Sequence, residues 1–161
     1  MFARDRLAFV RTLHEEVARF VRKAERAGLK PAVRLNGTSD IRYHARRAER
    51  ALLHEHFTDV QFYDYTAVTF DPDKLPRNMY YTFSRKEDNA RKCIMMLQRG
   101  VNVAAVFKGT MPDTYWDHTV IDGDAHDLRF LDVSTRIVGL TPKGKRARND
   151  SSNFVTEVAA C

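Results

Sequence analysis

The segment VNVAAVF, residues 101–107, limits the possible folds more than any other stretch of this chain. It is an apolar run with a single asparagine, and a strand of this composition has to be covered on both faces. Strands covered on both faces are typical of parallel sheets, in which helices form the connections between strands. The segment therefore predicts a parallel sheet with helices packed on it.

Other segments alternate between helix and strand patterns in a way that supports this prediction. Apolar residues recur at three- and four-residue steps over residues 7–27, and again from a cap at Ser39 or Asp40 to His56. Strand patterns occupy residues 31–35, 60–70, 79–83, 101–107 and 137–140. The order predicts an α/β fold with a mostly parallel sheet and helical crossovers, either an incomplete (β/α) barrel or an open sheet of about five strands.

A third helix is predicted between the strand at 79–83 and Gly100, because Ser84 and Glu87 have the spacing of a capping box. Its inward face would consist of Ala90, Cys93, Ile94 and Leu97. The last segment, FVTEV at 154–158, is either a terminal strand or a tail. With 161 residues and no linker, the chain is expected to form a single domain, residues 1–161, with a mobile basic loop at 143–153.

The net charge of +6 and a pI of about 9.5 come mostly from clustered arginine and lysine residues. Such clusters favour a polyanionic partner, either nucleic acid or an acidic protein, although a solvated basic surface has the same composition. The candidate polyanion-binding residues are Arg42, Arg46, Arg47, Arg50, Lys143, Lys145, Arg146 and Arg148.

Cysteine usage and hydropathy exclude several classes of protein. The two cysteines, Cys93 and Cys161, belong to no CxxC pair, and no zinc or iron–sulfur motif is present. No run resembles a transmembrane segment, and the N-terminus has no apolar signal core, so we expect a cytoplasmic protein. No cofactor is predicted, and a divalent metal is left open by the carboxylates described below.

Polar residues gather where the predicted strands end, which is where parallel sheets bind ligands. Asn36, Ser39 and Asp40 follow the first strand, although Ser39 or Asp40 also has the chemistry of a simple helix cap. Asp64 and Tyr65 lie in the second strand, where a carboxylate either pairs inside the protein or faces a ligand cavity.

The stretch VIDGDAHDLRFLD, residues 120–132, carries closely spaced carboxylates. One interpretation is a divalent-metal or acid–base site that includes Asp122 and Asp127. The other is a tight turn at Gly123 and Asp124 between two short strands, with an ion pair between Asp127 and Arg129.

Two functions follow from these residues. In the first, the chain binds a polyanionic partner through its basic surface. In the second, it is a (β/α)-type enzyme acting on a nucleotide or a nucleic-acid base, with Asp40, Asp64 and Asp122 as acid, base or nucleophile. The substrate would then be held by Asn36, Ser39, Tyr65, Asp127 and Arg129.

Six blocks of the chain also resemble a known family: PAVRLNGTSDI, VQFYDYT, YYTFSRKEDN, GVNVAAVFKG, VIDGDAHDLRFLD and IVGLTPKGKRARND. From about residue 2 to residue 155 the chain is similar to a largely uncharacterised family of phage, prophage and plasmid proteins, related to mycobacteriophage "gene product" proteins. The resemblance implies a mobile-element protein that binds nucleic acid or a host defence or nucleic-acid-processing complex.

The resemblance also implies that longer relatives carry an N-terminal segment with closely spaced cysteines, similar to the cluster-binding loop of radical-SAM half-barrels. Cys93 and Cys161 do not match those cysteines, so this chain is expected to hold no iron–sulfur cluster. It would be a trimmed barrel with an exposed sheet edge, and such an edge favours a homo-oligomer or partner binding.

Overall fold

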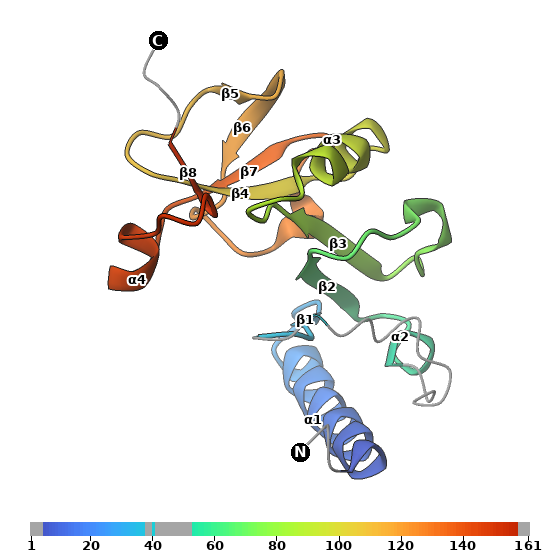
Figure 1. Cartoon of the computed structure of the whole chain (residues 1–161). Coiled ribbons are helices and arrows are strands. Elements are labelled where there is room, and N and C mark those ends of the chain that lie inside the picture. The colour runs from blue at the N-terminus through green and yellow to red at the C-terminus, as the bar shows by residue number, and fades with distance from the viewer. Residues whose placement is uncertain (1–4, 38–39, 41–52, 158–161) are drawn as a thin grey trace. The chain divides into compact units, whose positions relative to one another are not determined.

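A computed structural model describes residues 5–37, 40 and 53–157 of the chain (Figure 1). The α-helices are α1 (Arg6–Arg26), α2 (Leu53–His56), α3 (Ala90–Gln98) and α4 (Gly144–Arg148), and short 3₁₀ helices are η3 (Pro72–Lys74) and η4 (Arg129–Leu131). The strands are β1 (Ala32–Arg34), β2 (Gln61–Thr66), β3 (Met79–Ser84), β4 (Val103–Phe107), β5 (Thr114–Tyr115), β6 (His118–Asp122), β7 (Ile137–Leu140) and β8 (Val155–Thr156).

The described strands form one eight-stranded sheet in the order β1-β2-β3-β4-β7-β6-β5, and β8 pairs with β4. The pairs β1–β2, β3–β4, β4–β7, β4–β8 and β6–β7 are parallel, and β5–β6 is antiparallel. The α/β class and the open, mostly parallel sheet are confirmed. The sheet has more strands than the five predicted because the segments that form β5 and β6 have no clear strand pattern, and because FVTEV, predicted as either a strand or a tail, forms β8.

The chain divides into two compact units. Unit 1 consists of residues 1–63 and 74–80, and unit 2 of residues 64–73 and 81–161. The prediction of a single domain stays a prediction.

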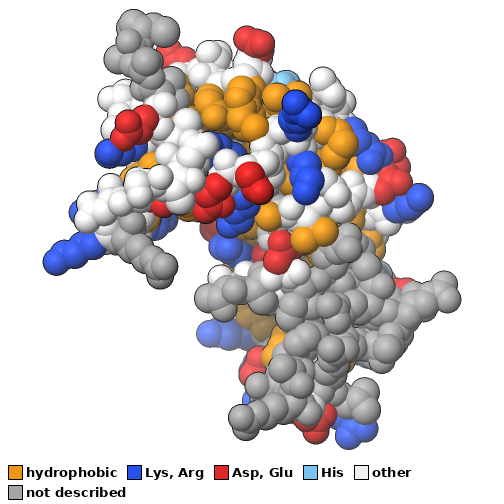
Figure 2. Space-filling view, viewed as in Figure 1, with side chains coloured by type: hydrophobic (Ala, Val, Ile, Leu, Met, Phe, Trp, Pro, Cys, Tyr) orange, Lys and Arg blue, Asp and Glu red, His pale blue; other side chains and the backbone are white. Residues whose placement is uncertain are grey.

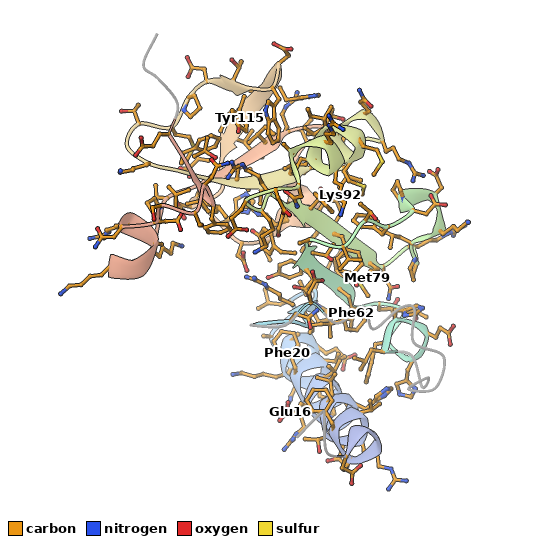
Figure 3. The ribbon with its side chains drawn as sticks, viewed as in Figure 1. Glu16, Phe20, Phe62, Met79, Lys92 and Tyr115 are labelled. Atoms are coloured by element: carbon orange, nitrogen blue, oxygen red, sulfur yellow. The ribbon has the colours of Figure 1, made fainter. Side chains whose placement is uncertain are left out.

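In unit 1, the helix predicted at 7–27 is present as α1. Asp5 is its N-cap residue, and Asp5 Oδ1 accepts a hydrogen bond from the Ala8 amide. Val17 and Ala24 of α1 are buried. Phe62 and Met79, labelled in Figure 3, are buried at 0% and 5% exposure. This burial places apolar residues of both the helix and the strands in the core of the unit.

In unit 2, β4 is the central strand and its composition matches the prediction made for it. Val103, Ala105 and Phe107 are at most 1% exposed. Val106 pairs with Leu140 of β7 and with Val155 of β8, so β7 and β8 lie on opposite edges of β4. The terminal segment therefore contributes a short strand, as one of the two interpretations of FVTEV predicted.

The start of α3 differs from the predicted capping box. The helix begins after Asn89, not after Ser84, because the Asn89 side chain organises the preceding turn: its Oδ1 accepts from the Lys86 amide and its Nδ2 donates to the Ser84 carbonyl. The inward face also differs, since Cys93, Met96 and Leu97 are buried whereas Ile94 is 38% exposed.

A β-hairpin formed by β5 and β6 lies just before Gly123, in a segment whose sequence has no clear strand pattern. It joins β5 and β6 through Trp116 and Asp117, whose φ angles are 50° and 61°. Gly123 instead follows β6, and the strands on either side of it, β6 and β7, are parallel. The turn predicted at Gly123 and Asp124 is present as a bend after β6, where Asp122 Oδ1 accepts from the Asp124 amide, but it does not join the two strands directly, because parallel strands need a longer crossover.

Over the described ranges, no helix has the length and apolar character needed to cross a membrane.

Candidate functional site

The strand ends of unit 2 come together at one edge of the sheet. Asp122, the last residue of β6, pairs with Gly139 of β7, and Leu140 of β7 pairs with Val106 of β4. The residues that follow these strands, which include Gly123, Lys108 and Thr141, therefore leave the sheet on the same side. This is the edge at which parallel sheets bind ligands.

Asp124 connects the end of β6 to the end of β7. Its Oδ2 accepts hydrogen bonds from the Thr141 amide and hydroxyl, both at 2.8 Å, and its Oδ1 lies 3.2 Å from the Lys143 ammonium. Partial burial raises the pKa of Asp124, but the Thr141 hydrogen bonds and the Lys143 charge outweigh burial and the net shift is downward. Asp122 in turn accepts from the Asp124 amide. These contacts fix the start of the basic segment against the sheet.

Two glycines allow the backbone to pack closely at this edge. A Cβ on Gly123 would lie 2.5 Å from Val138 Cγ1 and 2.7 Å from the Gly139 carbonyl oxygen. A Cβ on Gly139 would lie 2.4 Å from Met111 Sδ. The Gly123 amide donates to the Gly139 carbonyl at 2.8 Å, so the turn after β6 lies directly on β7.

Two of the predicted ligand-binding residues are neighbours in the structure. The Tyr65 hydroxyl of β2 donates to Asp127 Oδ1 at 3.3 Å, which joins β2 to the segment that follows β6. Asp64 is 1% exposed, and its Oδ1 accepts from the Tyr65 amide at 2.9 Å. Tyr65 and Asp127 thus belong to one cluster, and the carboxylate of Asp64 faces the protein interior.

Arg129 is fully buried and forms an ion pair with Asp132. Its Nη1 lies 3.3 Å from Asp132 Oδ2, and the side chains of Arg129 and Asp132 are 0% and 4% exposed. Arg129 Nη2 also donates to the His126 carbonyl and lies 3.1 Å from His126 Nδ1. Burial raises the pKa of Asp132, although the charges of Arg129 and His126 oppose the shift. Nε and Nη1 of Arg129 have no hydrogen-bond partner in the described chain, so the pairing offsets the desolvation only in part.

The remaining enzyme candidates are spread over the chain. Asn36, which is 4% exposed, and Asp40, which is exposed, belong to unit 1, whereas Asp64 and Asp122 belong to unit 2. In the sheet, β3, β4 and β7 lie between the strands of Asp64 and Asp122. Ser39 lies outside the described residues. A catalytic site built from Asp40, Asp64 and Asp122 stays a prediction.

The basic segment forms α4 and a loop held by hydrogen bonds. Lys143, Lys145 and Arg148 are exposed, and Figure 2 shows blue side chains projecting from this region. After α4, Asp150 accepts from the Val155 amide at 3.0 Å. The prediction that 143–153 is mobile is not tested by these contacts. The side chain of Arg146 and the residues Arg42, Arg46, Arg47 and Arg50 lie outside the described part.

Arg85 anchors this loop, although it was not among the predicted site residues. It is 6% exposed, and its Nη1 donates to the carbonyls of Asn153 and Phe154 at 2.6 and 2.7 Å. The only sequence signal was its position directly after β3, at the same sheet edge. In the described ranges, no group of three or more His, Cys, Asp or Glu side chains is arranged to hold a metal ion.

The fold and this strand-end cluster define an α/β protein with a mostly parallel open sheet, and comparison with protein families identifies it further. The model of the gene product 88 family matches residues 1–157, so the chain belongs to this phage-derived family. No curated protein and no solved structure matches the chain.

Proposed function

We propose that this gene product 88 protein binds nucleic acid through the basic side chains of α4, and that the arginine-rich residues 42–50 bind the same class of partner. The observation that carries the proposal is the placement of Lys145 and Arg148, exposed on α4, directly after β7 at the ligand-binding edge of the sheet. Phosphate contacts by such side chains supply most of the affinity of sequence-independent binding.

The local charge supports this proposal. No Asp or Glu occurs between Val133 and Asn149, a stretch that carries five Lys and Arg residues. Asp124 accepts hydrogen bonds from Thr141, which fix the start of this stretch on the sheet. The lysine and arginine residues that follow Thr141 therefore begin from a defined position. A phage-derived protein of this kind would work in the cytoplasm of the host cell, where nucleic acid is present.

The test measures the affinity for short fluorescein-labelled single-stranded DNA, duplex DNA and RNA by anisotropy at about 50 and about 200 mM salt. The variant is Lys145→Gln/Arg148→Gln, and the matched control is Lys92→Gln/Arg91→Gln on α3, which removes one exposed Lys and one exposed Arg elsewhere in unit 2. Figure 3 labels Lys92 on α3.

Two lost phosphate contacts should reduce the salt slope of the variant by about 1.8, whereas the control should keep the slope of the wild type. An equal decrease of the salt slope in the α4 variant and in the control would show that the net charge of the protein alone determines binding. An α4 variant that binds like the wild type would refute the role of α4.

A further inference from the structure

The helix α1 carries a row of cations on the face opposite to its buried residues. At about 100° per residue, Arg19, Arg22, Lys23 and Arg26 fall within an arc of about 100°. The arc is centred opposite Val17, which is 4% exposed. All four cations are exposed. They follow the i, i+3, i+4, i+7 spacing that aligns side chains along one face, and we call this set the α1 basic face.

The α1 basic face is not explained by the stability of the helix alone. Lys23 and Arg26 lie in the last turn, where cations interact favourably with the helix dipole. Arg19 and Arg22 lie farther from the C-terminus, where that effect has faded. Glu15 and Glu16 lie four and three residues before Arg19, and Glu25 lies three residues after Arg22, but among the described residues no ion pair joins these carboxylates to the α1 basic face.

The chemistry of the face fits phosphates better than a protein surface. Protein interfaces have an apolar centre, and the α1 basic face has none. The nearest large apolar side chain is Phe20, which Figure 3 labels and which is 43% exposed. From the 100° step of the helix, Phe20 lies about 60° outside the arc. The four cations extend over about 10 Å of helix, and an α-helix with its side chains has about the width of the major groove of a duplex.

We infer that the α1 basic face is a second nucleic-acid contact, which binds the phosphate backbone of a duplex without reading its sequence. This inference rests on the proposed function, because it adds a surface for the same class of partner. Four phosphate contacts contribute about 3.6 to the salt slope. No residue of α4 or of the segment 42–50 takes part in this surface.

The test uses the full chain with the substitutions Arg19→Gln/Arg22→Gln/Lys23→Gln. The matched control is Arg77→Gln/Arg91→Gln/Lys92→Gln, which also removes two exposed arginines and one exposed lysine. Glutamine is a good helix former, and a circular dichroism spectrum and a thermal melt verify that the fold is retained. A charge-preserving variant, Arg19→Lys/Arg22→Lys, provides a second measurement that does not depend on removing charge.

Binding of a labelled DNA duplex is measured between about 50 and about 200 mM salt. The α1 variant should have a slope shallower by about 2.7, so that the wild type loses roughly 40-fold more affinity than the variant over this range. The control and the charge-preserving variant should keep the slope of the wild type.

Equal losses in the α1 variant and the control would overturn the inference, because net charge alone would then explain binding. An α1 variant that binds like the wild type, beside a weakened Lys145→Gln/Arg148→Gln variant, would refute the inference and leave the proposed function standing. A wild type that binds no duplex at the lower salt concentration would refute the inference, and a wild type that also binds neither single-stranded DNA nor RNA would refute the proposed function as well.

Discussion

Replacing Asp132 with Asn is expected to destabilise unit 2 strongly. The substitution removes the carboxylate that lies 3.3 Å from Arg129 Nη1 and leaves a guanidinium that is 0% exposed without its counter-ion. Breaking a buried ion pair by removing one partner costs about 3–5 kcal/mol, because the remaining charge stays buried. For a chain of this size, each kcal/mol lowers the melting temperature by about 2–4 °C, so the decrease should be roughly 6–20 °C.

The double variant Arg129→Met/Asp132→Leu separates the contact itself from the penalty of an unpaired charge. A buried ion pair replaced by apolar side chains of similar size is often neutral or stabilising, so the double variant should be close to the wild type in stability. Urea unfolding and thermal melts of the wild type, of the single variants Arg129→Met and Asp132→Leu and of the double variant complete the cycle. The reasoning fails if Asp132→Asn loses less than about 1 kcal/mol, or if the double variant is as unstable as the single ones.

Three further predictions concern the sheet of unit 2. Gly123→Ala should lower the free energy of unfolding by about 1–3 kcal/mol, because its Cβ would lie 2.7 Å from the Gly139 carbonyl oxygen, and an unchanged urea midpoint would contradict this. Asn102→Ala should lower the free energy of unfolding by about 2–4 kcal/mol, because the buried Asn102 side chain accepts from the Arg136 amide at 2.9 Å and donates to the Val133 carbonyl at 3.0 Å. The rate of hydrogen exchange at the Arg136 amide should rise in this variant. The pKa of Asp124 is lower in the folded chain than its value of about 3.9 in the unfolded chain. The Asp124 carboxylate therefore stabilises the fold above about pH 4, and this stabilisation is lost as the pH falls through the folded pKa. The difference in melting temperature between the wild type and Asp124→Asn should accordingly shrink below about pH 4.

The parts of the fold that could be predicted are those with a regular apolar pattern. The continuous apolar run of β4 and the three- and four-residue steps of α1 each reflect one environment over many residues, so the pattern is strong. The hairpin at Trp116 and Asp117 was missed because both residues have positive φ, and such turns are normally signalled by Asn or Gly.

The site was predictable only where position along the chain determines position in the sheet. Tyr65 was selected as a strand-end residue and Asp127 as one of the closely spaced carboxylates of residues 120–132, and the structure joins them. The ion pair of Arg129 with Asp132 was not predicted. Arginine is seldom fully buried, and the residues around Arg129 form no pattern that indicates its burial. The proposed pairing of Asp127 with Arg129 considered the nearer carboxylate, whereas η4 places Asp132, its C-cap residue, at the i,i+3 spacing from Arg129.

The most direct test of nucleic-acid binding is the salt dependence of the affinity of the wild type for a short DNA duplex. If Lys145, Arg148 and the α1 basic face all contact phosphates, their six cations, at about 0.9 each, predict a slope of log affinity against log salt near −5 or steeper. A slope near zero, or no binding at about 50 mM salt, would contradict the account.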